Sequence, residues 1–481
     1  MSALPTSPFG PAARLPLPAV QSGADYSLAV PRDARLELAR GWLWLGLAAL
    51  IASGLFSVLL VLSRTPGINQ LLPVADFFHV ALVVHVDLSV LVWFIALAGM
   101  LWSLNGSSRR MGWGWLALGL ATIGALSMAL SPFLGGGEAI MANYIPVLTA
   151  PLFILGLLTF AVGVALLVLR GLVNAPKLGF EFDGRGALCF GLNAAAVATA
   201  VALLAFGWSW VVLPGALSGK AYYEILFWGG GHALQFTWTL LMLVAWLWLA
   251  SDCGGRVPLS PRVTLLMFAL ALASVFVTPY AYLAYDIASV EHRALLTWAM
   301  RLGGGVAIVP VALAVVFALL TAPKAGATAR PLRAALLSSV VLFVAGGAIG
   351  IFIDGSNVRI PAHYHGCIVG VTLALMGLVY QLLPALGYRA PQGRLATSQP
   401  WLYAAGQLMH ITGLVWSGGY GVQRKVAGAD QVLHSTAEIA GMGLMGLGGA
   451  IAIVGGLLFV VVVLRAMRNP VVSSGALPVA R

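Results

Sequence analysis

The 481-residue chain has few charged residues: Asp, Glu, Lys and Arg make up 9% of it, whereas hydrophobic residues make up 60%. Together with a mean hydropathy of +0.96, this excludes a soluble protein of two or three domains, which the length alone would allow. The three cysteines, Cys189, Cys253 and Cys367, are isolated from one another, which argues against a disulfide framework or a thiolate cluster. No Cys-x-x-Cys-His motif occurs, so covalent heme attachment is excluded.

The two ends of the chain lack long apolar runs. Residues 1–40 are rich in Pro, Ala and Ser, which excludes a cleaved signal peptide and predicts a disordered N-terminal tail. Residues 469–481 are expected to form a C-terminal tail after a membrane domain at residues 41–468. We place both tails in the cytoplasm, with the domain in the inner membrane of a bacterium.

The sequence has instead a succession of apolar stretches, each long enough for the roughly 20 residues with which a helix crosses a bilayer. We predict an all-α integral membrane protein with about twelve transmembrane helices. The predicted helices cover residues 41–63, 75–103, 112–133, 144–170, 185–213, 222–251, 259–287, 293–321, 330–353, 361–386, 399–419 and 433–468.

Basic residues gather in every second connecting segment, beginning with the segment before the first helix. This asymmetry fits the positive-inside rule for an even number of helices with both termini in the cytoplasm. The formal net charge of +11 is therefore a topology signal. We predict membrane lipid as the surrounding medium and no nucleic acid as a partner.

Ionisable groups at membrane depth are costly, so the eight histidines are the first candidates for functional residues. His85 and His232 are expected about 15 Å below the outer surface, and His363 and His365 slightly shallower. Two residues on a helix point about 200° apart, so His363 and His365 cannot bind one metal but can each hold a planar cofactor on opposite faces. Imidazole is the usual axial ligand of heme iron. A single such histidine is as often only a hydrogen-bonding residue.

Several stretches resemble the catalytic subunit I of the heme-copper oxidase and nitric oxide reductase superfamily, a twelve-helix fold. Ala362-His363-Tyr364-His365-Gly366 is similar to the family's tenth-helix motif, and the segment from His85 to Trp93 is similar to the second helix of the nitric oxide reductases. The resemblance implies that His85 and His365 ligate a low-spin heme and that His363 is the proximal ligand of a high-spin heme. The hemes are expected to be b-type.

Two further stretches extend this resemblance. Phe227 to His232 is similar to the sixth-helix Gly-His motif, which implies that His232 ligates a second metal, copper or non-heme iron. Arg424 and Lys425 resemble the basic pair that binds heme propionates, which is the role expected of cations at the outer edge of the membrane.

The sequence departs from the family at the seventh helix, where a His-His pair is expected and residues 278–283 read Thr-Pro-Tyr-Ala-Tyr-Leu. Tyr280 and Tyr282, with Gln235, are the candidate replacements, although they are weak ligands. The sixth helix also lacks the carboxylate with which nitric oxide reductases hold non-heme iron. Proton pumping is not predicted, because no chain of buried acids is evident.

Three functions remain open at this stage. The first is an oxidoreductase subunit that passes electrons from a low-spin to a high-spin heme and reduces O₂ or NO. The second is a non-catalytic diheme electron-transfer or gas-sensing subunit without the second metal. The third is a heme-free transporter that uses its histidines for protons or substrate. For the first two, we expect other subunits of a respiratory complex and an electron donor such as cytochrome c.

The remaining intramembrane polar residues receive simpler assignments. Arg301 is expected about 12 Å deep and is a candidate for the cofactor pocket. His410 is predicted to be a packing or hydrogen-bonding residue. His79, His292 and His434 are predicted to lie near the outer surface in contact with solvent.

Overall fold

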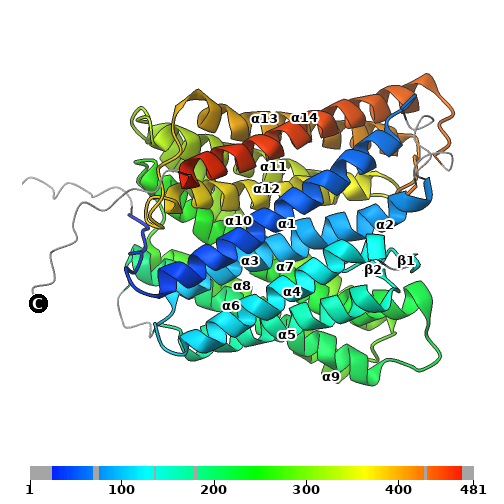
Figure 1. Cartoon of the computed structure of the whole chain (residues 1–481), viewed down its shortest axis with the longest axis horizontal. Coiled ribbons are helices and arrows are strands. Elements are labelled where there is room, and N and C mark those ends of the chain that lie inside the picture. Colours follow the sequence, from blue (N-terminus) through cyan, green and yellow to red (C-terminus); the bar gives the residue numbers. More distant parts are fainter. Residues whose placement is uncertain (1–23, 69–74, 135–136, 177–181, 427–430, 469–481) are drawn as a thin grey trace, which may run out of the picture.

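The computed structural model describes residues 24–68, 75–134, 137–176, 182–426 and 431–468, and these fold into a bundle of long helices (Figure 1). The elements are α1 (Arg35–Arg64), α2 (Ala75–Val86), the π-helix η1 (Asp87–Val92), α3 (Trp93–Asn105), α4 (Met111–Leu134), β1 (Ala139–Ile140), β2 (Val147–Leu148), α5 (Pro151–Val173), α6 (Gly184–Val212), α7 (Gly219–Asp252), α8 (Pro261–Val275), α9 (Val277–Ala284), α10 (Val290–Thr321), α11 (Ala329–Ile351), α12 (Arg359–Leu382), α13 (Gly393–Gly419) and α14 (Thr436–Met467).

In the described part of the chain, eleven helical segments are long and apolar enough to cross a membrane. Two of these segments are compound: α2, η1 and α3 form one continuous crossing, and α8 continues into α9. The remaining helix, α13, has 27 residues and packs along α14, and polar side chains such as Gln399 and His410 lower its hydropathy. It makes the twelfth crossing, so the predicted all-α membrane fold is confirmed.

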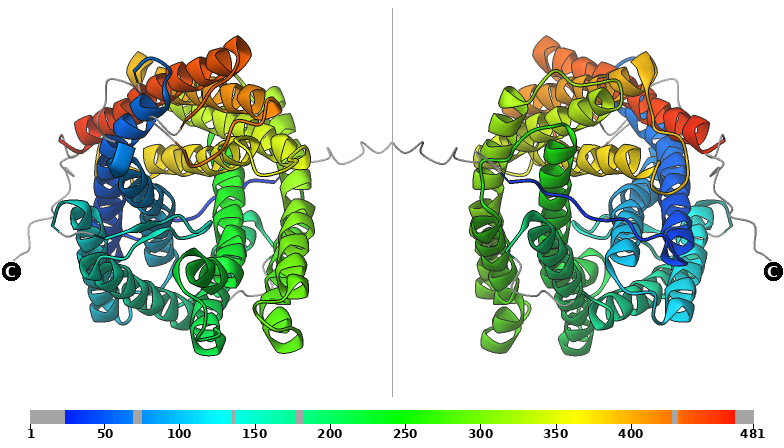
Figure 2. Two further views of the ribbon diagram at one scale, coloured as in Figure 1. Left: turned by 90° about the vertical axis from the view of Figure 1, so that its right-hand side faces the viewer. Right: turned by 90° about the vertical axis from the view of Figure 1, so that its left-hand side faces the viewer.

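Most helices form the outside of the bundle, with α14 beside α1, whereas α3, α7 and α12 are the most buried and α12 lies in the interior (Figure 2). We call the end that holds β1, β2 and the connection between α13 and α14 the outer end, after the orientation predicted from the sequence. It lies on the right in Figure 1. The most extensive contacts are those of α13 with α14, α11 with α12, and α4 with α5.

Short polar motifs begin several of the helices. Asp183 accepts a hydrogen bond from the Gly186 N–H at the start of α6, and Ser260 does the same for Val263 at the start of α8. Such side chains satisfy backbone donors that a helix leaves unpaired at its first turn. These motifs divide the apolar sequence into separate helices.

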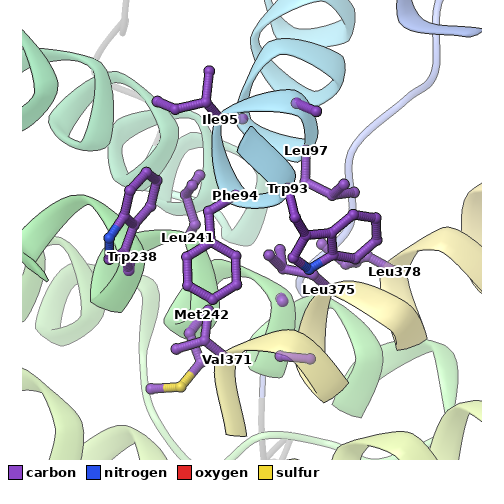
Figure 3. Close-up of a cluster of buried hydrophobic side chains, with 14 of the residues drawn as sticks. Trp93, Phe94, Ile95, Leu97, Trp238, Leu241, Met242, Val371, Leu375 and Leu378 are labelled. Atoms are coloured by element: carbon purple, nitrogen blue, oxygen red, sulfur yellow. The ribbon is translucent and has the colours of Figure 1, made fainter. Parts of the chain in front are cut away.

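A core of large apolar side chains joins α3, α7 and α12 toward the inner end (Figure 3). Trp93 and Phe94 of the second crossing meet Trp238 and Met242 of α7 and Leu375 of α12. All five side chains are buried. This packing fixes the relative positions of the three helices that carry His85, His232, His363 and His365.

Two sequence-based boundaries are wrong. The helix predicted from residue 144 begins at Pro151, because Ala139–Ile140 and Val147–Leu148 pair as a short antiparallel hairpin. The disordered tail predicted over residues 1–40 is ordered from residue 24: Ala24 pairs with Val257, and Tyr26 is completely buried and bonded to Thr264. Residues 1–23 and 469–481 lie outside the described residues.

Candidate functional site

The imidazoles of His85 and His365 make the same kind of contact, from Nδ1 to a backbone carbonyl. Nδ1 of His85 lies 3.0 Å from the carbonyl oxygen of Ser53, and Nδ1 of His365 lies 2.8 Å from that of Pro361. A carbonyl oxygen can only accept, so a proton on Nδ1 satisfies the contact in both rings. The Ser53 hydroxyl also lies 2.9 Å from Nδ1 of His85, and it can donate to the His85 carbonyl at 3.1 Å. Among the described residues neither Nε2 atom has a hydrogen-bond partner, which leaves its lone pair available to a metal.

His365 lies at the meeting point of three crossings. Its ring centroid is 5.0 Å from that of His410 on α13, and it is close enough to His85 for the two imidazoles to interact electrostatically. His410 donates from Nδ1 to the carbonyl of Met445 at 3.0 Å, which confirms the predicted hydrogen-bonding role. The position of His410 beside the candidate ligand His365 could not be read from the sequence.

His363 points to a different neighbour from His365, as their spacing predicts. Its Nδ1 lies 2.7 Å from the carbonyl oxygen of Gly346 on α11. A methyl group at Gly350 would come within 2.5 Å of the same ring, so the glycine makes room for the imidazole. Nε2 of His363 again has no hydrogen-bond partner among the described residues. The two histidines of α12 therefore face different neighbours, Gly346 on α11 and His410 on α13.

His232 is buried on α7, with 2% of its surface exposed. Its Nδ1 donates to the carbonyl of Trp228 at 2.8 Å, and its Nε2 accepts from the hydroxyl of Tyr144 at 3.0 Å. On the surface of α7 beside His232, Tyr144 packs on Gly231 and Tyr282 packs on Gly229. His232 thus points between these two tyrosines.

The two tyrosines proposed as replacement ligands lie in different environments. Tyr280 is 57% exposed on the outside of α9, away from the interior of the bundle. Tyr282 is buried, and its hydroxyl lies 2.6 Å from Oγ of Ser209. Only Tyr282 is therefore placed near His232.

The prediction that His292 lies near the outer surface in contact with solvent is wrong, because its side chain is buried. It is 1% exposed, and neither of its ring nitrogens has a hydrogen-bond partner among the described residues. Its ring packs edge-on against Tyr282 with centroids 4.8 Å apart. A charged turn, Glu291-His292-Arg293, surrounds it in the sequence and hides this burial. No sequence signal separates it from an exposed histidine.

The basic pair Arg424 and Lys425 lies at the outer end, against the connection between α4 and α5. Nζ of Lys425 donates to the carbonyl of Met141 at 2.7 Å, and an Arg424 nitrogen donates to Oδ1 of Asn143 at 3.3 Å. Burial, reinforced by the neighbouring Arg424 charge, lowers the pKa of Lys425 to about 8. Within the described residues, neither cation has a carboxylate partner within salt-bridge distance.

Arg64 at the end of α1 adds a third cation, held by the side chain of Gln431 at 3.3 Å. Arg64 and Arg424 both lie close enough to Tyr364, which adjoins His365, to interact with it electrostatically. The outer end above His365 is thus rich in cations. Such a surface suits carboxylates of a bound group.

Two other polar residues stand apart from this arrangement. Arg301, the other candidate for the cofactor pocket, has its side chain on the exposed surface of α10, where its guanidinium lies over the ring of Trp298. The structure does not bring it together with the histidines. Asp87 is 1% exposed at the start of η1, and its two carboxylate oxygens have no hydrogen-bond partner among the described residues.

Comparison with known proteins supports the resemblance seen in the sequence. A family model described as Cytochrome C and Quinol oxidase polypeptide I matches residues 37–469. An uncharacterized protein of Rickettsia prowazekii (strain Madrid E) is 32% identical over 88% of this chain and 94% of its own length. An uncharacterized protein of Aquifex aeolicus (strain VF5) is 30% identical over 73% of this chain and 86% of its own length.

The fold also resembles a solved structure. A heme-copper terminal oxidase dimer determined by cryo-EM matches with a TM-score of 0.70 and 18% sequence identity. The match covers 92% of this chain and 85% of the oxidase chain. At this identity the likeness establishes the arrangement of the helices.

Proposed function

The chain belongs to the cytochrome c and quinol oxidase polypeptide I family, and from this premise we propose that it is a diheme redox subunit. In this proposal, electrons pass from a low-spin heme held by His85 and His365 to a high-spin heme held by His363, where O₂ or NO is reduced. Both hemes are proposed to be b-type, and the chain has no Cys-x-x-Cys-His motif for covalent attachment.

The observation that carries this proposal is the state of the three histidines. Each of His85, His363 and His365 has its Nδ1 within hydrogen-bond distance of a backbone carbonyl, and its Nε2 has no hydrogen-bond partner in the described part of the chain. Metal-ligating histidines characteristically donate their other N–H to a carbonyl or carboxylate, which fixes the ring and raises its basicity. His410 shares the Nδ1 contact to a carbonyl, so this feature by itself only prepares a ring for a metal, and the motifs of the second and tenth helices select these three histidines.

The cations at the outer end provide a second line of support. Arg64, Arg424 and Lys425 lie near the α12 motif without carboxylate partners in the described part of the chain. Heme propionates would supply the missing negative charge, with charge-assisted hydrogen bonds. The proposed hemes therefore have their carboxylate edges toward the outer surface.

Bound heme iron would supply one-electron transfer and, where one axial position is open, gas binding. His85 and His365 come from two different crossings and would together hold one heme iron. His363 faces away from this pair and would hold the other. The Gly346 carbonyl holds its ring in a single tautomer. The chain thus separates an electron-transfer position from a reaction position.

A second candidate function is a diheme subunit that transfers electrons or senses gas without a second metal. It is favoured by the α9 stretch, where Tyr280 is 57% and Leu283 is 76% exposed, so neither replaces the family's His-His pair. In either case, we propose that an electron donor such as cytochrome c and other subunits complete a respiratory complex in a bacterial inner membrane, with both chain termini in the cytoplasm.

The test begins with the dithionite-reduced spectrum of the purified protein, with and without carbon monoxide. Two hemes per chain, one of which shifts its Soret band with CO, are expected. His363→Ala should remove the CO response and His85→Ala the low-spin signal, whereas His434→Ala, at an exposed histidine, should change neither. Heme bands indifferent to CO would favour the second candidate, and no heme at all would refute both.

A further inference from the structure

A cavity of about 270 Å³ lies at the inner end of the bundle. Its walls come from the end of α3, the start of α6, the end of α7 and the segment that precedes α1. The candidate heme site lies elsewhere, since Trp248 in the cavity wall follows His232 by roughly 24 Å along the axis of α7. The cavity is therefore a separate feature, and in the predicted orientation it faces the cytoplasm.

The floor of the cavity is apolar. It consists of Leu101 and Leu104 of α3, Leu192 of α6 and Trp248 of α7, and all four side chains are buried. Water gains few hydrogen bonds against such a wall, whereas an apolar guest removes apolar surface from water. The floor therefore favours the hydrocarbon part of a ligand.

The rim of the cavity carries a positive charge. Arg185, in the first turn of α6, is exposed and has no carboxylate within salt-bridge distance in the described part of the chain. Arg35 also lines the cavity, but Asp33 accepts hydrogen bonds from its Nε at 2.9 Å and from its Nη2 at 2.7 Å and so neutralises it. Asn105 adds an amide, which donates to Asn193 at 3.1 Å. Arg185 is thus the cation available to an anionic ligand.

The segment of residues 27–32 covers part of the cavity and is held mainly at its two ends. Tyr26 bonds to α7 and α8 at one end, and Asp33 bonds to Arg35 at the other. Residues 27–32 themselves make no hydrogen bond to any described residue, and Leu28 to Pro31 line the cavity. A segment without backbone hydrogen bonds opens at lower cost than a helix. A ligand can therefore enter while the helices stay folded.

We propose that this cavity binds an anionic amphiphile, with its carboxylate or phosphate head on Arg185 and its alkyl chain against the apolar floor. Guanidinium pairs with both kinds of head through charge-assisted hydrogen bonds. Arg185 and Leu192 are about 10 Å apart along α6, which is the depth available to the chain. Basic pockets between membrane helices on the cytoplasmic side suit such heads. The source is either a free fatty acid or a phospholipid of the inner leaflet, and the inference does not depend on the proposed redox function.

The test uses the full-length protein in phosphatidylcholine nanodiscs, with decanoate that carries a photoreactive diazirine at its chain end as the probe. After illumination, mass spectrometry of peptides locates and counts the adducts, and unlabelled fatty acids serve as competitors. Arg185→Gln removes the charge at the rim, and Arg185→Lys keeps it. Arg256→Gln removes an exposed charge that also lies at the inner end but does not line the cavity, so it is the matched control.

Adducts are expected on α3 near Leu101 and on α6 near Leu192, and unlabelled decanoate should suppress them. Competitors from butanoate to octanoate should gain about fourfold in affinity for each added methylene, because each one is buried against the floor. Arg185→Gln should weaken decanoate binding by roughly tenfold, the effect of losing a charge-assisted hydrogen bond. Arg185→Lys and Arg256→Gln should retain most of the binding, since the rim charge remains.

The map of adducts in the wild type tests the proposal without any variant. Adducts that all lie outside the cavity, or that unlabelled decanoate does not suppress, would overturn it, as would equal affinity in Arg185→Gln and the wild type. Native mass spectrometry of the purified protein separates the two sources. A phospholipid that is retained by the wild type, lost in Arg185→Gln and displaced by decanoate would assign the site to a membrane lipid. Suppressible adducts in a protein that retains no phospholipid would assign it to a free fatty acid.

Discussion

We predict that heme affinity depends on pH through Lys425, the proposed partner of a heme propionate. In the protein without heme its pKa is lowered to about 8 by burial and the adjacent Arg424 charge. A propionate bound to the Lys425 ammonium would favour the charged form and raise the pKa toward the ordinary value of about 10.4. Heme binding therefore requires proton uptake between these two values.

The pKa values of Lys425 with and without heme set the sign and size of the change in heme affinity. Below pH 8 the amine is already protonated, so heme affinity is unaffected by pH. Above pH 8 affinity falls as pH rises, by about tenfold at pH 9, and the fall ends near the pKa of the heme-bound state. Lys425→Arg should abolish this dependence because guanidinium stays charged, and Lys425→Met should show weak binding at every pH.

The assay is the equilibrium partition of heme between the protein and a competing heme-binding protein of pH-independent affinity, followed optically from pH 7 to pH 10. The Arg variant is the matched control for general alkaline instability. A wild-type partition that does not change between pH 7.5 and pH 9.5 would refute the reasoning. A slope that persists unchanged in Lys425→Arg would assign it to another group.

Three further predictions concern ligands and packing. His365→Ala should abolish the low-spin heme EPR signal, whereas His410→Ala should retain it; loss of the signal in the second variant would make His410 the axial ligand. Gly346→Ala should destabilise the protein by about 1–3 kcal/mol, because the added methyl would lie 2.5 Å from the backbone of α12. In the control, Gly347→Ala, the methyl meets nothing within 4 Å, so the thermal inactivation temperature should be unchanged. Tyr26→Phe should cost about 1 kcal/mol and speed proteolysis of the N-terminal segment; unchanged proteolysis would contradict the role of its hydroxyl bonds.

The fold could be predicted from the sequence because lipid imposes a simple rule on it. Only helices satisfy all backbone groups in hydrocarbon, so each long apolar stretch must be a crossing. The rule fails where the chain leaves the membrane. The hairpin at 139–148 packs against α2 and α7, and the ordered segment from residue 24 pairs with Val257. Hydropathy records neither of these contacts.

The candidate site was predictable to the extent that its residues belong to a motif. His363 and His365 carry a spacing whose geometric consequence holds in the structure, since they turn to α11 and α13. His292 and His410 have no motif, and their importance arises from tertiary neighbours. Arg301 shows the converse, because depth along a helix does not reveal which face carries a side chain.

The N-terminal segment has a consequence for how the protein is made. The Tyr26 N–H donates to Oγ of Ser251, 225 residues later in the chain. At roughly 5–20 residues per second of synthesis, the docking position would not exist until on the order of 10–45 s after Tyr26 is made. The segment must therefore wait unpaired beside the ribosome while six crossings are inserted. Its docking would be a late event of biogenesis, and protease resistance at Tyr26 would report that α7 and α8 have come together.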